Sequence, residues 1–367
     1  MGFKCGIVGL PNVGKSTLFN ALLSTMQAEA ANYPFCTIEP NLGRVQVPDD
    51  RLQKLAAIAG SATIIPTQLE FVDIAGLVRG ASKGEGLGNK FLSHIREVDA
   101  ILYVLRCFED GDIVHVENNI DPLRDAEIVE TELMLADLES VEKRLPPLQK
   151  RAKGGDVEAI EQVTVMERVL KAVAEGKPAR SIEIKNASEK KALEMLHLLT
   201  SKPILFICNV DEGSAATGNS LSAKVEEMAK KRNAPCVVIS ARIEAEISML
   251  QSDQEKKEFL DSLGLPETGL SRIIKAGYSL LDLVTYFTVG PKEARAWTIP
   301  IGTTAPQAAG VIHTDFERGF IRAETIAYPD YVEHNGESGT KKAGKFRLEG
   351  KEYIVQDGDV LHFRFNV

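Results

Sequence analysis

The stretch at residues 9–16 reads GLPNVGKS and decides the fold of the N-terminal part of this chain. It follows a short apolar run at 4–8, and residues 17–23 have the composition of a helix. The pattern G-x-x-x-x-G-K-[ST] between a strand and a helix is typical of a phosphate-binding loop. Its glycines let backbone N–H groups turn toward phosphate oxygens, and the helix N-terminus adds partial positive charge. We therefore predict an α/β fold of the P-loop NTPase (G-domain) class.

Single residues of this loop have distinct expected roles. Lys15 is expected to reach the β- and γ-phosphates and to act in catalysis, and the Ser16 hydroxyl can ligate Mg²⁺. The loop thus predicts a nucleotide site with Mg²⁺ as its cofactor. The residues expected to surround the phosphates are Asn12, Val13, Gly14, Lys15, Ser16 and Thr17.

A second motif supports the nucleotide site. The strand-like run at 68–72 leads into DIAG, and a D-x-x-G at a strand end places the carboxylate of Asp73 near the metal. The N–H of Gly76 would then lie near the γ-phosphate, at the centre of the reaction. Between the two motifs, Thr37 is the candidate switch residue for Mg²⁺. Cys36 lies beside it and is a candidate redox site, since its oxidation would disturb nucleotide-dependent ordering.

Size and composition exclude several classes of protein. A chain of 367 residues is long for one core and indicates two or three domains. The hydrophobic share of 44% and the charged share of 26% are typical of a soluble globular protein, and the net charge of −9 does not itself predict nucleic-acid binding. Five scattered cysteines favour a reducing compartment. With no signal-peptide layout and no long apolar run, we expect a cytoplasmic protein without membrane contact, and a monomer.

Further motifs resemble a known family. GASKGEGLG at 80–88, together with GLPNVGKS and DIAG, resembles the Obg-related P-loop proteins. NVDE at 209–212 and the C-terminal third narrow the resemblance to the YchF/Obg-like ATPase family, along essentially the whole chain. The resemblance implies three parts, the last of which is ubiquitin-like: a G domain at 1–124 and 199–280, a helical insertion at 125–198, and a TGS domain at 281–367.

The residue pattern agrees with this division. Apolar residues recur at helical spacing from 128 to 145, and we expect the Pro-Pro pair at 146–147 and the Gly-Gly pair at 154–155 to break that run. A second helix is expected around 157–174. From residue 284 onward the pattern changes to short strands and turns, which indicates a small β-rich module. Its candidate strands read TYFTVG, AWTIPIG, FIRAETI, YIVQDGD and VLHFRF.

The sequence FICNVDE at 206–212 bears on the choice of base. GTP-binding proteins usually carry Asn-Lys-x-Asp here, and the aspartate accepts two hydrogen bonds from guanine. In this chain Glu212 takes the fourth position, and its extra methylene would misplace that grip. Asn209 can bond either purine, so guanine preference should be lost and ATP is favoured. The resemblance implies the same, with the backbone at Val210 helping to read adenine.

Two observations leave the base open. Ser240 and Ala241 follow the strand at 237–239 and mark the nucleotide pocket, but they resemble a loop that bonds guanine O6 and do not favour adenine. Position 212 could also be tolerant of glutamate, and the protein would then be a GTPase.

The catalytic groups need separate consideration. Many small GTPases place a glutamine after D-x-x-G to orient water, but this chain has Leu77 there, so hydrolysis is slow or uses another group. Asn12 matches the asparagine of K⁺-activated G proteins, although any small polar residue would fit the loop. His115 matches a flexible-loop histidine that the family is thought to use to position water. His94 ranks lower, because its apolar neighbours suggest a packed position.

Three hypotheses about function remain. The first is a slow ATP-hydrolysing switch that reports its state to the ribosome, the partner that the resemblance implies. The second is a GTPase of translation or ribosome assembly, and the third is a nucleotide-gated RNA- or ribosome-binding module in which hydrolysis is incidental. Basic clusters would suit RNA phosphates, although solvated helix faces explain them equally simply. They lie at 143–144, 150–153, 190–191 and 230–232.

Overall fold

Contacts between residues divide the chain into two units, each described here by itself. The N-terminal unit comprises Phe3–Arg44 and Glu70–Gly277, and the C-terminal unit comprises Val45–Leu69 and Tyr278–Val367. The computed structural model describes residues 3–30, 42–74, 87–110, 119–250 and 252–366, with the backbone alone for 25–30, 87–90 and 253.

The N-terminal unit is built on a six-stranded sheet in the order β2-β4-β1-β5-β6-β7. The pairs that join β4, β1, β5, β6 and β7 are all parallel. Every residue of β5 and β6 is buried, which explains why these strands are unbroken apolar runs in the sequence. The strands are β1 (Lys4–Val8), β2 (Leu42–Gln46), β4 (Gln68–Asp73), β5 (Ala100–Arg106), β6 (Ile204–Asn209) and β7 (Cys236–Ile239). The carboxyl ends of the parallel strands β4, β1, β5, β6 and β7 meet at one edge, where ligands bind in sheets of this kind.

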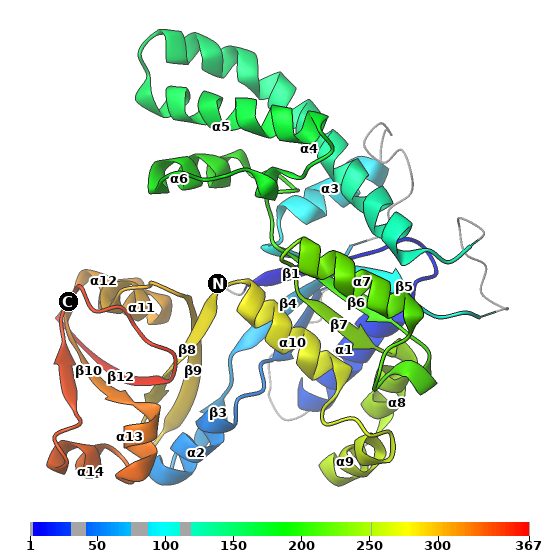
Figure 1. Ribbon diagram of the computed structural model, residues 1–367. Coiled ribbons are helices and arrows are strands. Elements are labelled where there is room, and N and C mark those ends of the chain that lie inside the picture. The colour runs from blue at the N-terminus through cyan, green and yellow to red at the C-terminus, as the bar shows by residue number, and fades with distance from the viewer. Residues whose placement is uncertain (1–2, 31–41, 75–86, 111–118, 251, 367) are drawn as a thin grey trace. The chain divides into compact units, whose positions relative to one another are not determined.

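Helices pack on this sheet and extend from it (Figure 1). Most begin at a side-chain cap: Asp121, for example, accepts from two amides at the start of α4. The helices are α1 (Lys15–Ala30), α3 (Leu87–Arg96), α4 (Pro122–Lys153), α5 (Val157–Ala174), α6 (Ala187–Leu196), α7 (Ser220–Lys231), α8 (Ala241–Met249), α9 (Asp253–Ser262) and α10 (Gly269–Leu280), with 3₁₀ turns η1 (Ala179–Ser181) and η2 (Glu212–Ser214).

Helices α4, α5 and α6 form an arm in which α4 and α5 run antiparallel (Figure 1). The expected second helix at 157–174 is confirmed as α5. The expectation that the prolines at 146–147 break the first helix is wrong, because α4 continues through them for 32 residues. Leu145 and Leu148, on either side of the prolines, pack in the apolar cluster of the arm. Burying such side chains offsets a cost of about 3 kcal/mol per proline.

Buried polar groups join the arm to the sheet. Asp137 of α4 is 1% exposed and accepts from the amides of Leu199 and Thr200, just before β6, at 2.8 Å each. Glu130, two turns earlier on the same face of α4, pairs with Arg180 and with Arg232, the latter at 2.6 Å. Because these groups are buried and mutually satisfied, they fix where α4 leaves the sheet.

The C-terminal unit has its own six-stranded sheet, in the order β11-β10-β12-β8-β9-β3. β8 and β9 form an antiparallel hairpin, β10 pairs antiparallel with β11 and β12, and the pairs β12–β8 and β3–β9 are parallel. The strands are β3 (Thr63–Ile65), β8 (Leu283–Val289), β9 (Glu293–Pro300), β10 (Phe320–Ala327), β11 (Arg347–Glu349) and β12 (Asp359–Phe365).

Both faces of this sheet are covered. Alternate residues of β12 point to opposite faces, so Leu361 packs in one core and Val360 in the other. The core that contains Leu361 also holds residues of α11, and the core that contains Val360 holds residues of α2 and α13. The helices of the unit are α2 (Asp50–Ala59), α11 (Ala305–Ile312), α12 (Thr314–Arg318), α13 (Tyr328–Glu333) and α14 (Glu337–Lys342).

The β-rich C-terminal module is confirmed, with one difference in detail. Four of the five candidate strands lie in β8, β9, β10 and β12, but YIVQDGD at 353–359 forms a connection with a single bridge from Ile354 to Thr304. Asp359 accepts from Gln356 N–H at 2.9 Å and from the Tyr353 hydroxyl at 2.7 Å, so local bonds close a turn here instead of a ladder.

The segment at 45–69 differs from its expected place. The boundaries drawn from the sequence put it in the G domain, whereas its contacts put it in the C-terminal unit. β3 pairs with β9, and Leu52 and Leu55 of α2 are buried in the core with Phe287. These are pairings between residues more than two hundred positions apart, which no local pattern reveals.

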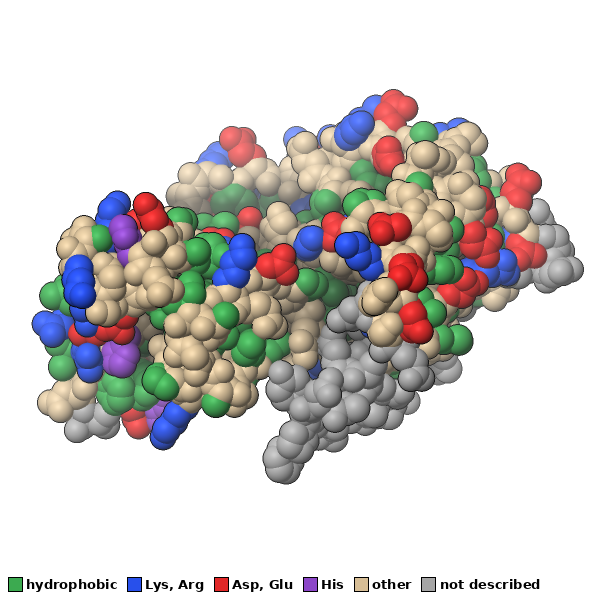
Figure 2. All heavy atoms as spheres, turned by 90° about the horizontal axis from the view of Figure 1, so that it is seen from below, with side chains coloured by type: hydrophobic (Ala, Val, Ile, Leu, Met, Phe, Trp, Pro, Cys, Tyr) green, Lys and Arg blue, Asp and Glu red, His purple; other side chains and the backbone are tan. Residues whose placement is uncertain are grey.

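In the described part of the chain, no helix is both long enough and apolar enough to cross a membrane. On the face drawn in Figure 2, positive and negative side chains are interspersed, as expected for solvated helix faces.

Candidate nucleotide-binding site

The phosphate loop joins the end of β1 to the start of α1, and its glycines are fixed by packing. A Cβ on Gly9 would lie 2.7 Å from the carbonyl oxygen of Val104, and one on Gly14 would lie 2.1 Å from Nδ2 of Asn209. Gly14 also has a φ of 90°, which residues with a side chain rarely adopt. The loop therefore needs glycine at both positions to lie against β5 and β6.

Asn12 lies in the same loop with a φ of 63° and is exposed. Asparagine tolerates this left-handed conformation better than most residues do. The backbone thus gives a reason for asparagine at this position that is independent of a bound ion.

Lys15 and Asp73 form an ion pair beside the loop. The parallel register of β1 and β4 sets Asp73 opposite Ile7, so its carboxylate comes to the edge of the sheet where α1 begins. Lys15 is 9% exposed, and Ser16, the next residue of α1, is exposed. A carboxylate and a hydroxyl are oxygen ligands of the kind that Mg²⁺ takes. Asp73 and Ser16 therefore fit the metal role expected of them.

Asn209 stands at the other side of the site and ties three elements together. Its Nδ2 donates to the carbonyl oxygen of Val13 in the phosphate loop at 2.9 Å, and its Oδ1 accepts from the amide of Ala241 at 2.9 Å. The side chain is buried, at 4% exposure. An amide nitrogen carries two hydrogens, so one remains for a purine.

Val210 and Ser240 are held by the sheet and by α8. The N–H of Val210 donates to the carbonyl oxygen of Ile239 at 2.8 Å. Ser240 is 2% exposed and precedes the first turn of α8, where its carbonyl oxygen accepts from Glu244 N–H at 3.1 Å. Residues 209–210 and 240–241, which were both expected at the nucleotide pocket, thus lie side by side.

The two carboxylates that follow Val210 have different partners. Asp211 caps the turn η2, and its carboxylate accepts from both the amide and the hydroxyl of Ser214 at 3.0 Å. Glu212 pairs with Arg242 of α8, with Oε1 and Nη1 3.0 Å apart. Asp211 lies only one position from the usual base-reading aspartate. Its carboxylate is nevertheless bonded within its own turn.

A cavity of about 830 Å³ joins the phosphate side to the base side. It is lined by the phosphate loop, by 108–110, by 209–212 and by the start of α8. Its volume suits a nucleotide, since ligand pockets span roughly 300–1,000 Å³.

Arg106 positions one wall of this cavity and was not expected from the sequence. The side chain is 1% exposed, its Nε donates to the carbonyl oxygen of Phe108 at 3.2 Å, and Nη2 donates to that of Asp110 at 3.3 Å. Its guanidinium also lies 4.7 Å from the centre of the Phe108 ring. The signal in the sequence was an arginine at the end of an apolar strand, where a buried charge needs a specific reason.

Four candidates from the sequence, Cys36, Thr37, Gly76 and His115, lie outside the described residues. Cys5, Cys107, Cys208 and Cys236 are free thiols. His94 is exposed on α3, although its neighbours Phe91 and Leu92 are buried, so the expectation of a packed His94 is wrong.

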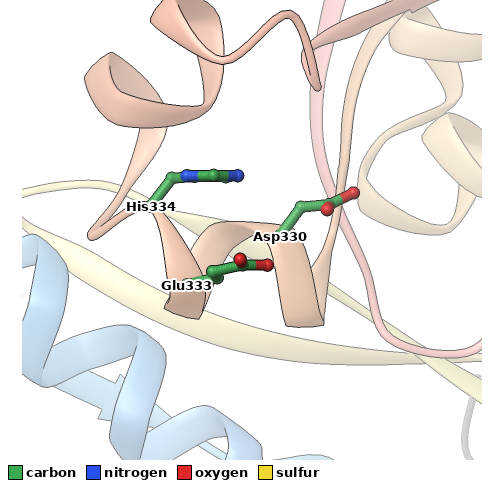
Figure 3. A group of neighbouring side chains, drawn as sticks. All are labelled: Asp330, Glu333 and His334. Carbon is green, nitrogen blue, oxygen red and sulfur yellow. The ribbon is translucent and has the colours of Figure 1, made fainter.

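A separate group of possible metal ligands lies in the C-terminal unit. Figure 3 shows Asp330, Glu333 and His334 converging around α13, with their ligand atoms within 4.8 Å of one another. Lys345 already neutralises Asp330, with Nζ and Oδ1 3.4 Å apart, and Glu333 is exposed. We therefore assign no metal to this group.

Three features of this site occur together in P-loop NTPases of the GTPase type. They are a phosphate loop that requires glycine, a D-x-x-G strand end beside it and a buried asparagine on the base side. Comparison with protein families agrees. Residues 4–136 match the family model MMR_HSR1, described as "50S ribosome-binding GTPase". Residues 283–366 match YchF-GTPase_C, described as "Protein of unknown function (DUF933)".

Relatives narrow the class to one family. The chain is 60% identical to "Ribosome-binding ATPase YchF" of Haemophilus influenzae and 55% identical to that of Escherichia coli O157:H7, in each case over 100% of both chains. The solved structure of the Schizosaccharomyces pombe YchF GTPase superposes with a TM-score of 0.88 at 38% identity, covering 99% of this chain and 98% of that one. The chain belongs to the YchF family.

Proposed function

We propose that this protein is an ATP-binding, slowly ATP-hydrolysing switch that binds ribosomes and depends on Mg²⁺. The observation that carries the proposal is the state of the base side of the cavity. Asp211 is bonded to Ser214 and Glu212 to Arg242, so neither carboxylate is placed as the free acceptor that guanine needs. The relatives named as ribosome-binding ATPases support the same reading.

The remaining groups on the base side suit adenine. The N–H of Val210 is used within the sheet, so we assign its carbonyl oxygen to the base. A carbonyl accepts from the 6-amino group of adenine and repels O6 of guanine. Asn209 keeps one N–H for N7 of either purine, which holds the base without selecting it.

Hydrolysis would follow from positioning and charge. We assign Lys15 and the loop amides to the β- and γ-phosphates, and Ser16, Thr37 and Asp73 to Mg²⁺, which stabilises the charge that develops during transfer. The Gly76 amide would face the γ-phosphate and His115 would orient the attacking water. Because Leu77 cannot orient water, we expect a low rate, and a K⁺ ion held by Asn12 would raise it.

A GTPase is the second candidate, and the names of two of the matches favour it. The matching family model and the S. pombe structure are both called GTPases. Both candidates share every group on the phosphate side, so only the base discriminates between them.

The partner is proposed from the relatives. Several carry the name "Ribosome-binding", and the exposed arm of α4 to α6 with the C-terminal unit offers two surfaces for a large partner. We take the C-terminal unit to be the TGS domain and its contact to include RNA phosphates. The protein would then work as a monomer in the cytoplasm, where its partner is.

Titration calorimetry with ATP and GTP in Mg²⁺, in K⁺ and then Na⁺ buffer, tests the proposal. We expect ATP to bind at least tenfold more tightly, which corresponds to about 1.4 kcal/mol. Equal or tighter binding of GTP would overturn it in favour of the GTPase. Cosedimentation with ribosomes, with each nucleotide present, tests the partner. If His115→Ala abolished hydrolysis yet left ribosome binding and cellular function intact, hydrolysis would be incidental.

A further inference from the structure

We propose that Arg242 determines the choice of base, because Glu212 would have to give up its ion pair with Arg242 in order to accept from guanine. The inference deepens the proposed function and rests on it. The residue concerned, Arg242, lies in α8 and not in the N-V-D-E stretch at 209–212. It supplies an ion-pair partner for Glu212 that the sequence motif does not include.

The geometry brings Arg242 to the base side by two links. Asn209 accepts from Ala241 N–H at 2.9 Å, which fixes the first residue of α8 against the end of β6. Arg242 is the next residue, and its Nη1 lies 3.0 Å from Oε1 of Glu212. Both side chains line the same cavity of about 830 Å³ that the phosphate loop lines.

The local charge also favours this pairing. Glu212 raises the pKa of Arg242, with Asp110 and Glu246 contributing from further away. Arg242 therefore faces three carboxylates, of which Glu212 is the one in direct contact. Removing the guanidinium would leave the Glu212 carboxylate without this partner on the wall of the cavity.

The two purines respond differently to a carboxylate that is held in this way. Guanine presents two donors, N1–H and the 2-amino group, and a bidentate acceptor needs both carboxylate oxygens. Each carboxylate oxygen has a second acceptor position, so Arg242 does not block guanine outright, but turning both oxygens to the base would weaken the ion pair and lower the affinity for guanine. Adenine presents an acceptor at N1 and no amino group at C2, so it needs no carboxylate there and leaves the ion pair of Arg242 and Glu212 intact.

The ion pair of Arg242 and Glu212 contributes little to the stability of the fold, so its residues can be substituted to test the base preference. The side chains of Arg242 and Glu212 are 67% and 43% exposed, and exposed ion pairs add little to stability. Substitutions here should therefore leave the fold intact while changing the base preference.

The test is the affinity for ADP and for GDP, with Mg²⁺, of the wild type and of Arg242→Met, which keeps the length of the side chain and removes its charge. Diphosphates report the base without hydrolysis. We expect GDP to bind about fivefold more tightly to Arg242→Met than to the wild type, with ADP unchanged, because the carboxylate can then accept from guanine without losing an ion pair. Arg322→Met, exposed on β10, is the matched control and should change neither affinity.

A second variant separates the pair from the arginine alone. In a Glu212→Gln background, Arg242→Met should leave GDP affinity unchanged, since there is no carboxylate to free. A change of less than twofold in GDP affinity on Arg242→Met in the wild-type background would overturn the inference, as would the same gain in the Glu212→Gln background. This failure differs from that of the proposed function, which is decided by the ATP-to-GTP ratio of the wild type alone.

Discussion

At the scale of single residues, the candidate site depends on side chains that hold other parts of the site in place. Asn209 bonds the phosphate loop and α8 at once, and Asp211 and Glu212 are each directed by one partner. Arg106 acts in the same way on the loop at 108–110. The side chains around the candidate nucleotide site are therefore held by bonds within the protein.

Arg106→Met tests this positioning role. Methionine keeps most of the buried volume but removes the hydrogen bonds that Arg106 donates to the carbonyls of Phe108 and Asp110, so the wall of the cavity should loosen. We expect ADP affinity, measured by calorimetry with Mg²⁺, to fall about tenfold or more, or roughly 1.4 kcal/mol. Arg322→Met serves as the control. A lower melting temperature with an ADP affinity within twofold of the wild type would show that Arg106 supports only the fold.

At the scale of elements, buried carboxylates fasten helices to the sheet. Asp137 fixes α4 before β6, and Glu244 of α8 accepts from the first amides of α10, Gly269 N–H at 2.7 Å and Leu270 N–H at 3.2 Å. Burial raises the pKa of Glu244, and the two amides and Arg272 oppose that shift without cancelling it.

The raised pKa of Glu244 gives a pH dependence with a defined sign. Above the unfolded pKa of about 4.3, the folded state holds this proton longer than the unfolded state does, so stability falls as the pH rises toward the folded pKa. Glu244→Gln does not titrate and escapes that loss.

Urea unfolding of the wild type and of Glu244→Gln at pH 5 and at pH 8 measures the effect. We expect the free energy of unfolding of the wild type, relative to that of the variant, to be lower at pH 8 than at pH 5. Glu246→Gln, exposed on the same helix, is the control. An identical difference at both pH values would contradict the role of Glu244.

At the scale of the whole molecule, the chain crosses between its two units before either is complete. Residues 45–69 leave the N-terminal sheet and supply α2 and β3 to the C-terminal unit. Leu52 and Leu55 are 2% and 0% exposed in that core, and Arg51 binds Asp357 at 2.6 Å.

A truncated chain tests how much the C-terminal unit needs this segment. Burying a leucine contributes about 1.5–3 kcal/mol, so losing both removes a large share of the 5–15 kcal/mol typical of a domain. We expect a fragment of residues 278–367 to lack a cooperative thermal transition and a near-UV circular dichroism signal. The same fragment joined by a flexible linker to residues 45–69 should show both. Equal behaviour of the two fragments would show that α2 and β3 are dispensable.

The sequence by itself determined the parts of the protein that are coded locally. A phosphate loop, a D-x-x-G strand end and buried parallel strands each depend on residues that are close in the chain, and their spacing is fixed by backbone geometry. Residues 9–16, Asp73, Asn209 and 240–241 could be named from their neighbours alone, and so could α5. The glutamate at 212 could be read in the same way as a departure from the guanine-binding pattern.

Only the tertiary structure decided what these residues touch. The Arg242 partner of Glu212, the hold of Arg106 on its loop, the continuation of α4 through its prolines and the place of 45–69 all depend on contacts between residues distant in sequence. Such contacts are chosen by burial and by the pairing of desolvated polar groups, which are properties of the packed chain. The local sequence does not encode these contacts, and this is why they appear only once the chain is folded.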